Sequence, residues 1–118
     1  MSRSVTEQPD KWVIIKMTPT KGDPWYKVFA SWSGDYLGSD QWKMNSGITS
    51  VDSDDEYYYF SGQSGSCYKC HKNGYGVANS YSDSVLSNLI QNSYKINVTA
   101  EVLPPATNWE TLNNWIFK

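Results

Sequence analysis

The segment from Lys11 to Thr18 constrains the fold more than any other part of the chain. Its middle is rich in β-branched side chains, and apolar side chains occupy both alternating faces, so the segment predicts a central β-strand. A turn containing Gly and Pro follows at residues 19–24, and the alternation resumes from Trp25 to Trp32. Together the two segments predict a β-hairpin with a long loop.

Three further strand-like segments follow, separated by turns of Gly, Ser, Asp and Asn. They run from Gln41 to Asn45 with a continuation through Ile48 to Val51, from Tyr57 to Ser61, and from Ser66 to Lys72. Gly47 predicts a bulge within the first of them, and Asn73-Gly74, a dipeptide favoured in hairpins, closes the last. Strands joined by short turns in this order are typical of an antiparallel meander.

The pattern becomes helical after Ala78. One stripe of apolar side chains at helical spacing consists of Val85, Leu86, Leu89 and Ile90. Ser82 is the expected N-cap of this helix. Alternation returns from Lys95 to Leu103, and Thr107 with Glu110 forms a capping box that begins a second helix. The C-terminal third therefore contributes two helices and one more strand.

The order of strands before helices predicts an α+β fold. We expect an antiparallel twisted sheet of about five to six strands, a meander that can also curl into a half-barrel, with two helices in the C-terminal third. A length of 118 residues suits one domain. We assign residues 11–118 to this single α+β domain, and we expect residues 1–10, which are polar and contain Pro9, to be a flexible N-terminal arm.

The charge and hydropathy of the chain exclude several classes of partner. Ten basic and twelve acidic side chains give a net charge of −2 without a basic stripe, so double-stranded nucleic acid is not an expected partner. No segment approaches the ~20 consecutive apolar residues that cross a bilayer, and residues 1–10 lack the apolar core of a secretory signal. We therefore expect a cytoplasmic protein without a membrane partner and leave the oligomeric state open.

The string C-x-x-C-H, formed by Cys67, Cys70 and His71, contains both cysteines and the one histidine of the chain. Over five residues it resembles the haem-attachment motif of c-type cytochromes. Side chains three residues apart on a strand point to opposite faces, so Cys67 and Cys70 are not expected to hold one porphyrin or metal ion together. A closed zinc site would also need a fourth ligand. We therefore expect two free thiols and no metal or cofactor, and binding of a metal or other ligand by these three residues is the alternative function.

Catalytic motifs are missing from the sequence. There is no G-x-S-x-G and no phosphate-binding glycine loop, and any nucleophile–histidine pair would have to use His71. The segment from Asp52 to Glu56 contains four acids, and adjacent acids in a turn are typical of a solvated loop. We therefore expect a protein that is not an enzyme, and an enzyme with dispersed carboxylates is a third hypothesis.

Six Trp and nine Tyr make the chain unusually aromatic. Trp and Tyr are enriched at interfaces, although aromatic side chains also fill small β-rich cores. On the expected strands and loops, an exposed aromatic and acidic patch would consist of Trp25, Tyr36, Asp54, Asp55, Tyr57, Tyr59 and Tyr75. The sequence thus predicts a small non-enzymatic binding protein that engages a macromolecular partner, in the first place a protein, through this patch. The small size and the acidity of the chain are similar to those of many accessory or inhibitor proteins of phages and mobile elements.

Overall fold

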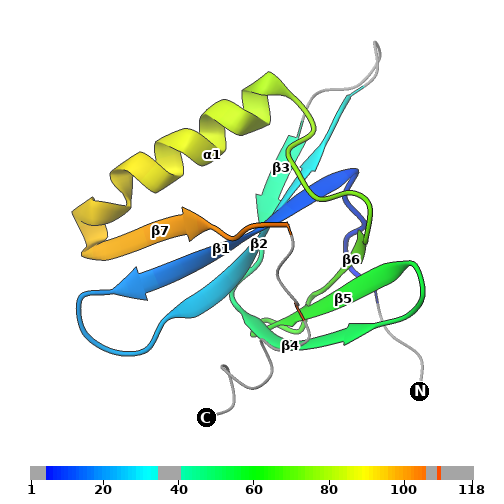
Figure 1. Ribbon diagram of the computed structural model, residues 1–118, viewed down its shortest axis with the longest axis horizontal. Coiled ribbons are helices and arrows are strands. Elements are labelled where there is room, and N and C mark those ends of the chain that lie inside the picture. The colour runs from blue at the N-terminus through cyan, green and yellow to red at the C-terminus, as the bar shows by residue number, and fades with distance from the viewer. Residues whose placement is uncertain (1–4, 35–40, 106–108, 110–118) are drawn as a thin grey trace.

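The computed structural model describes residues 5–34, 41–105 and 109, and their strands form two antiparallel sheets (Figure 1). The first sheet has the order β3-β2-β1-β7. Its strands in that order are Gln41–Met44, Trp25–Trp32, Lys11–Pro19 and Val98–Val102. The second sheet has the order β4-β5-β6. Its strands are Ile48–Ser53, Tyr57–Gly62 and Cys67–His71, and helix α1 (Ser80–Asn92) and the 3-10 turn η1 (Ser93–Ile96) come between β6 and β7.

Strand β1 lies in the interior of the first sheet, as its sequence predicts. It pairs with β2 as far as Met17 and with β7 from Ile15 onward. Even-numbered side chains such as Trp12 and Ile14 face the second sheet, whereas odd-numbered ones face α1. Each face of β1 therefore packs against its own apolar layer, which explains why both faces are apolar.

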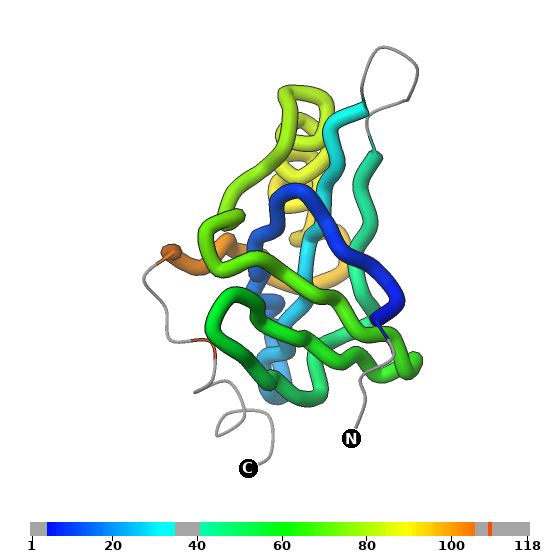
Figure 2. Tube along the Cα trace, turned by 90° about the vertical axis from the view of Figure 1, so that its right-hand side faces the viewer, coloured from blue at the N-terminus to red at the C-terminus, as the bar shows by residue number. Residues whose placement is uncertain are grey.

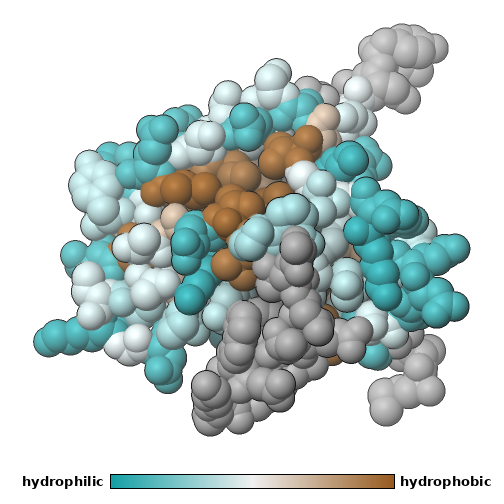
Figure 3. Space-filling view, viewed as in Figure 1, coloured by the Kyte–Doolittle hydropathy of each residue, from teal (hydrophilic) through white to brown (hydrophobic). Residues whose placement is uncertain are grey.

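Most of the buried apolar residues form two clusters, one on each face of the first sheet. The cluster between the two sheets consists of Trp12, Ile14, Tyr26, Val28, Ala30, Ile48, Val51, Phe60, Tyr68, Cys70 and Trp109. The cluster beneath α1 consists of Val13, Ile15, Met17, Phe29, Leu86, Val98 and Ala100. Helix α1 lies along β7 in Figure 1, and an apolar strip between these elements reaches the surface in Figure 3. The fold thus has three layers, in the order helix, sheet, sheet.

The expected single sheet of about five to six strands is not confirmed, because β3 and β4 belong to different sheets. Gly47 lies in the turn between them, with a φ of +137° that L side chains rarely adopt, and the register shift of β4 comes later, between Ile48 and Ser50. Before the turn, Oδ1 of Asn45 accepts the N–H of Val28 at 2.9 Å, which holds the end of β3 on β2. Stacking the second sheet on the first buries apolar faces that one open sheet would leave in water.

Helix α1 confirms the predicted apolar stripe. Leu86 is buried, and the other members of the stripe are partly buried against the same cluster. The N-cap is Asn79 rather than Ser82, because Oδ1 of Asn79 accepts the N–H of Ser82 at 2.8 Å. After the helix, Asn97 adopts a left-handed conformation with φ 61°, so the last strand begins later than its alternation predicts.

The expected second helix, with its capping box at Thr107 and Glu110, lies outside the described residues. Trp109 is the described member of that segment, and its side chain is 2% exposed in the cluster between the sheets. Within the described parts of the chain, no helix has both the length and the apolar character needed to cross a membrane.

The segment expected to be a flexible arm runs beside β6 in its described part (Figure 2). The N–H of Thr6 donates to the carbonyl of Cys67, and the N–H of Lys69 donates to the carbonyl of Glu7, both at 2.9 Å. The carboxylate of Glu7 also pairs with Lys43 of β3 at 2.8 Å. These contacts differ from the expectation because the edge of β6 offers backbone groups that need partners. The first four residues of the arm lie outside the described chain.

The turn at Asn73-Gly74 leads onto β1 and does not close a hairpin. The N–H of Trp12 donates to the carbonyl of Gly74 at 3.2 Å, and the N–H of Gly76 donates to the carbonyl of Trp12 at 2.9 Å. This short pairing is parallel, with Trp12 opposite Tyr75. It extends the first sheet beyond the end of β7.

Tyr75 fills the junction between this short pairing and β7. Its ring centroid lies 4.8 Å from that of Trp12 and 5.3 Å from that of Trp109. Its hydroxyl accepts the N–H of Ile14 at 3.2 Å and donates to the carbonyl of Leu103. Burial raises the pKa of Tyr75 to about 12, so the hydroxyl keeps its proton at neutral pH. The hydroxyl of Tyr75 therefore gives the N–H of Ile14 the hydrogen-bond acceptor that a neighbouring strand would otherwise provide.

We expect Tyr75→Phe to lower the free energy of unfolding by ~1–3 kcal/mol, because the N–H of Ile14 would lose its acceptor. Urea unfolding followed by tryptophan fluorescence measures this loss. Tyr94→Phe is the matched control, since Tyr94 is 68% exposed, and its expected change is within about 0.5 kcal/mol. Equal losses in the two variants would contradict the role of the Tyr75 hydroxyl.

Candidate functional site

The outer face of the second sheet, which is turned away from the first sheet, gathers polar and aromatic side chains. On β5, Tyr58 and Phe60 pack in the cluster between the sheets, so Tyr57 and Tyr59 belong to the outer face. This division of faces is the one that the alternation of the sequence predicts.

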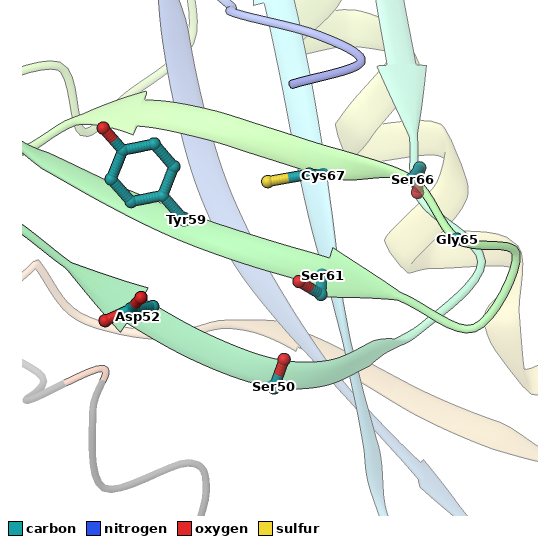
Figure 4. Close-up of a pocket in the computed structure, with 7 residues that line it drawn as sticks. All are labelled: Ser50, Asp52, Tyr59, Ser61, Gly65, Ser66 and Cys67. Carbon is teal, nitrogen blue, oxygen red and sulfur yellow. The ribbon is translucent and has the colours of Figure 1, made fainter. Parts of the chain in front are cut away.

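A cavity of about 380 Å³ lies on this outer face (Figure 4). All three strands and the β5–β6 turn contribute to its lining, which consists of Ser50, Asp52, Tyr59, Ser61, Gly65, Ser66 and Cys67. Four of the seven lining residues carry a hydroxyl group, and Asp52 adds a carboxylate. Ligand pockets span about 300–1,000 Å³, so this cavity has room for one side chain or a small molecule.

Tyr59 forms part of the cavity wall and is held in one orientation. Its hydroxyl donates to Oδ2 of Asp54 at 2.7 Å, and its side chain is only 7% exposed. The expectation that Tyr59 is exposed is therefore wrong. Tyr59 is on the middle strand of its sheet, opposite Asp52 on one side and Lys69 on the other, and side chains of both neighbouring strands flank its ring.

Asp54 organises the turn between β4 and β5. Its Oδ1 accepts the N–H of Glu56 at 2.9 Å and the N–H of Tyr57 at 2.8 Å, as in an Asx turn. The hydrogen bond from Tyr59, followed by these two backbone bonds, lowers the pKa of Asp54 to about 2. The carboxylate is therefore ionised throughout the physiological pH range, and the exposed Asp55 stands next to it.

Tyr57 lies at the same end of the sheet and is half-buried. Its ring meets the ring of His71 edge to face, with centroids 5.1 Å apart. The amino group of Lys69 stands 4.3 Å from the centroid of the Tyr57 ring, within the range of a cation–π contact. A cation on an aromatic ring is thus already part of this face.

The structure brings four members of the predicted patch together: Asp54, Asp55, Tyr57 and Tyr59 lie at the β4–β5 end of the second sheet. Two others lie elsewhere. Trp25 packs, half-buried, against the cluster beneath α1, and Tyr75 is half-buried beside Trp12 and Trp109. The expected single exposed patch is therefore wrong in these parts, because packing onto the two cores outweighs the exposure that their loop surroundings indicate. Tyr36 lies outside the described residues.

Sequence reasoning named Cys67 only in the alternative metal- or ligand-binding hypothesis, and it missed the cavity residues Ser50, Asp52, Ser61, Gly65 and Ser66. A signal for Asp52 existed in the alternation of β4. Val51 is buried, so its neighbours Ser50 and Asp52 must face outward. Their meeting with Ser61 and Ser66 depends on strand pairing, which the alternation of one strand does not encode.

Cys67 and Cys70 lie on opposite faces of β6, as the strand prediction requires. Cys67 lines the cavity, whereas Cys70 is fully buried in the cluster between the sheets. Burial raises the pKa of the Cys70 thiol well above its ordinary value. The two sulfur atoms therefore cannot converge with His71 on one metal ion. Within residues 5–34, 41–105 and 109, no group of three His, Cys, Asp or Glu side chains is arranged to hold a metal.

Comparison of the chain with protein-family models, with curated proteins and with solved structures found no match. The function is therefore argued from the cavity and the side chains around it.

We expect Cys70→Ser to lower the free energy of unfolding by ~1–3 kcal/mol, because a hydroxyl would enter an apolar cluster. Cys67→Ser should lower the free energy of unfolding by a smaller amount, since the Cys67 side chain already lines the cavity together with hydroxyl groups. Urea unfolding of the two single variants measures both losses. A larger loss in Cys67→Ser would contradict the assignment of faces.

Asp54 gives stability a dependence on pH in the acid range. Its pKa in the folded protein, about 2, is below the ordinary value of 3.8. The ionised Asp54 carboxylate therefore stabilises the fold at pH values above its ordinary pKa of 3.8, and this stabilisation is lost as the pH falls through about 2. We expect Asp54→Asn to lower the unfolding midpoint temperature near neutral pH and to show a smaller further decrease on acidification than the wild type. Thermal unfolding across this pH range tests this, with the exposed neighbour Asp55→Asn as control, and an unchanged acid profile in Asp54→Asn would contradict it.

Proposed function

We propose that this protein is a small non-enzymatic binding protein that engages a protein partner through the outer face of β4-β5-β6. The observation that carries the proposal is the cavity of about 380 Å³ on that face. It lies beside the hydrogen-bonded pair of Tyr59 and Asp54, which keeps one wall in a fixed orientation. A recess whose walls are already ordered binds a protruding side chain without the entropic cost of ordering those walls.

The chemistry of the face favours binding over catalysis. The low pKa of Asp54 makes its carboxylate a weak base near neutral pH. Cys67 and His71 are separated by four positions along β6, or about 13 Å on an extended strand, so the thiol has no adjacent imidazole to accept its proton. The groups on this face are suited to hydrogen bonding, aromatic contact and charge attraction.

The charge of the face indicates the kind of partner. Four acidic side chains, those of Asp52, Asp54, Asp55 and Glu56, follow one another closely at the end of β4 and in the turn. Lys69 supplies a positive charge nearby. An acidic surface of this kind attracts basic partners and speeds their encounter. An accessory or inhibitor role, of the type found in phages and mobile elements, belongs to the same proposal.

We expect the folded protein to enrich peptides from a displayed random-peptide library through this outer face. Ser50→Leu places a bulky apolar group in the cavity, and Ser84→Leu makes the same change at an exposed position on α1. The enriched peptides should bind Ser50→Leu about tenfold more weakly than the wild type, which corresponds to ~1.4 kcal/mol. Their binding to Ser84→Leu should be unchanged. Fluorescence polarisation with labelled peptides measures both.

Two results would overturn the proposed function. One is a library selection in which no sequence is enriched over the uncoated support. The other is a set of enriched peptides that bind the wild type and Ser50→Leu equally. The near-ultraviolet circular dichroism spectrum of each variant, compared with that of the wild type, shows that the fold is retained.

A further inference from the structure

We propose that two copies of this chain associate through the outer edge of β7, so that their first sheets join into one continuous sheet. In the part of the chain that the structure describes, β7 is the last strand of the first sheet and pairs with β1 alone. An edge strand presents a row of N–H and carbonyl groups on which another strand can pair. This inference concerns the first sheet and does not depend on the cavity of the second sheet.

The hydrogen bonding between β1 and β7 shows which backbone groups of β7 point outward. The N–H of Leu103 donates to the carbonyl of Ile14 at 2.9 Å, so the backbone groups of Leu103 are directed toward β1. Along an antiparallel strand this direction alternates from one residue to the next. The N–H and carbonyl groups of Ala100 and Val102 therefore point away from β1, toward the outer edge.

One register makes β7 complementary to a second copy of itself. A two-fold axis at Ala100 places Ala100 of one copy opposite Ala100 of the other. Val98 then lies opposite Val102 of the second copy, and Thr99 lies opposite Glu101 of the second copy. All five residues of β7 are paired in this register, and the outward-pointing backbone groups of the two copies meet. Apolar side chains face apolar ones, and no two like charges are opposed.

The neighbouring registers are less favourable. A register centred on Glu101 places two carboxylates opposite each other, and like charges in that position destabilise a strand pair. A register centred on Thr99 leaves Glu101 and Val102 beyond the end of the partner strand. A shift by one residue sets outward-pointing backbone groups against inward-pointing ones and turns apolar side chains onto the polar face.

The exposed apolar side chains at the two ends of β7 support a second copy as the partner. Val102 lies opposite Ile15, whose side chain belongs to the cluster beneath α1, but Val102 is 38% exposed. Ile96, just before β7, is 66% exposed. Antiparallel pairing brings the end of one β7 beside the start of the other, so Val102 of each copy approaches Ile96 and Val98 of the other. The apolar strips between α1 and β7, which reach the surface in Figure 3, would meet across this edge and leave water.

The polar face of β7 is compatible with the same pairing. Glu101 lies opposite Lys16 on β1, so a positive charge of its own copy stands beside it. Across the two-fold axis Glu101 meets the neutral Thr99 of the second copy. A two-fold axis repeats each of these matches, because the same surface is used by both copies.

Sedimentation equilibrium over a range of protein concentrations tests the association. We expect a monomer–dimer equilibrium in which the weight-average mass rises toward that of two chains between about 10 μM and 1 mM, as for a small interface. A mixed sample of isotope-labelled and unlabelled protein then tests the register. Isotope-filtered nuclear Overhauser spectra should connect the α-protons of Thr99 and Glu101 in different copies, since this pair is of the closely spaced, non-hydrogen-bonded type. A monomer at every concentration, or a dimer without these contacts, would overturn the inference.

Val102→Lys places a charged amino group on the apolar face of the edge. It should weaken dimerisation at least about tenfold. Val5→Lys makes the same change in the segment beside β6, at a side chain that is 41% exposed, and should leave the dissociation constant unchanged. A dissociation constant for Val102→Lys equal to that of the wild type would contradict the proposed edge.

Thr99 allows a test in both directions, because its side chain is exposed on the polar face. Thr99→Lys sets a positive charge opposite Glu101 of the second copy and should tighten the dimer about threefold, whereas Thr99→Glu should weaken it by a similar factor. Gln63→Lys and Gln63→Glu make the same changes of net charge at an exposed position between β5 and β6, and their effects should be smaller. Equal association of the two Thr99 variants, or equal effects at Thr99 and Gln63, would overturn the inference even if Val102→Lys fails to fold.

Discussion

The side chain of Trp12 is the contact on which the relation between the two sheets depends. It is 1% exposed, and its indole N–H donates to the carbonyl of His71 at 2.7 Å. Its ring lies 5.4 Å from that of Phe60 on β5 and 5.7 Å from that of Trp109. One residue of the first sheet thus contacts the middle strand of the second sheet, the end of its last strand and a residue from the C-terminal region. Because these contacts hold the inner face of β4-β5-β6 against the first sheet, the opposite face of that sheet carries the cavity.

Local patterns of the sequence predicted most of the strands and α1, because alternation and helical spacing depend on neighbouring residues. They did not predict that the strands divide between two sheets. Alternation shows which face of a strand is apolar, but the layer that covers this face is chosen by contacts between distant parts of the chain. The same limitation applies to the N-terminal segment, whose polar composition indicates an arm and whose backbone pairs with β6. At α1, Asn79 and Ser82 are both good caps, and the buried position of Ser82 in the first turn decides between them.

The candidate site was predicted in part for the same physical reason. The alternation of β5 places Tyr57 and Tyr59 on the outer face, and the acids at the end of β4 and in the turn before β5 were visible as a run. The cavity itself requires β4 and β6 to lie on either side of β5, so no single segment of the sequence contains it. Tyr75 was expected to be exposed because its Gly-rich surroundings indicate a loop. Its ring instead contacts Trp12, and its hydroxyl donates to the carbonyl of Leu103 just after β7.

The pairing of β1 with β7 also has a consequence for the way the chain reaches its fold. Ile15 lies opposite Val102, so these partners come from opposite ends of the described sequence. Closing so long a loop carries an entropic cost before any contact compensates it, and folds dominated by such pairings form in milliseconds to seconds. During synthesis the β1–β2 hairpin can form early, while both apolar faces of β1 still lack their covering layers. Until β7 and the second sheet arrive, the most apolar strand of the protein is also the segment most exposed to aggregation.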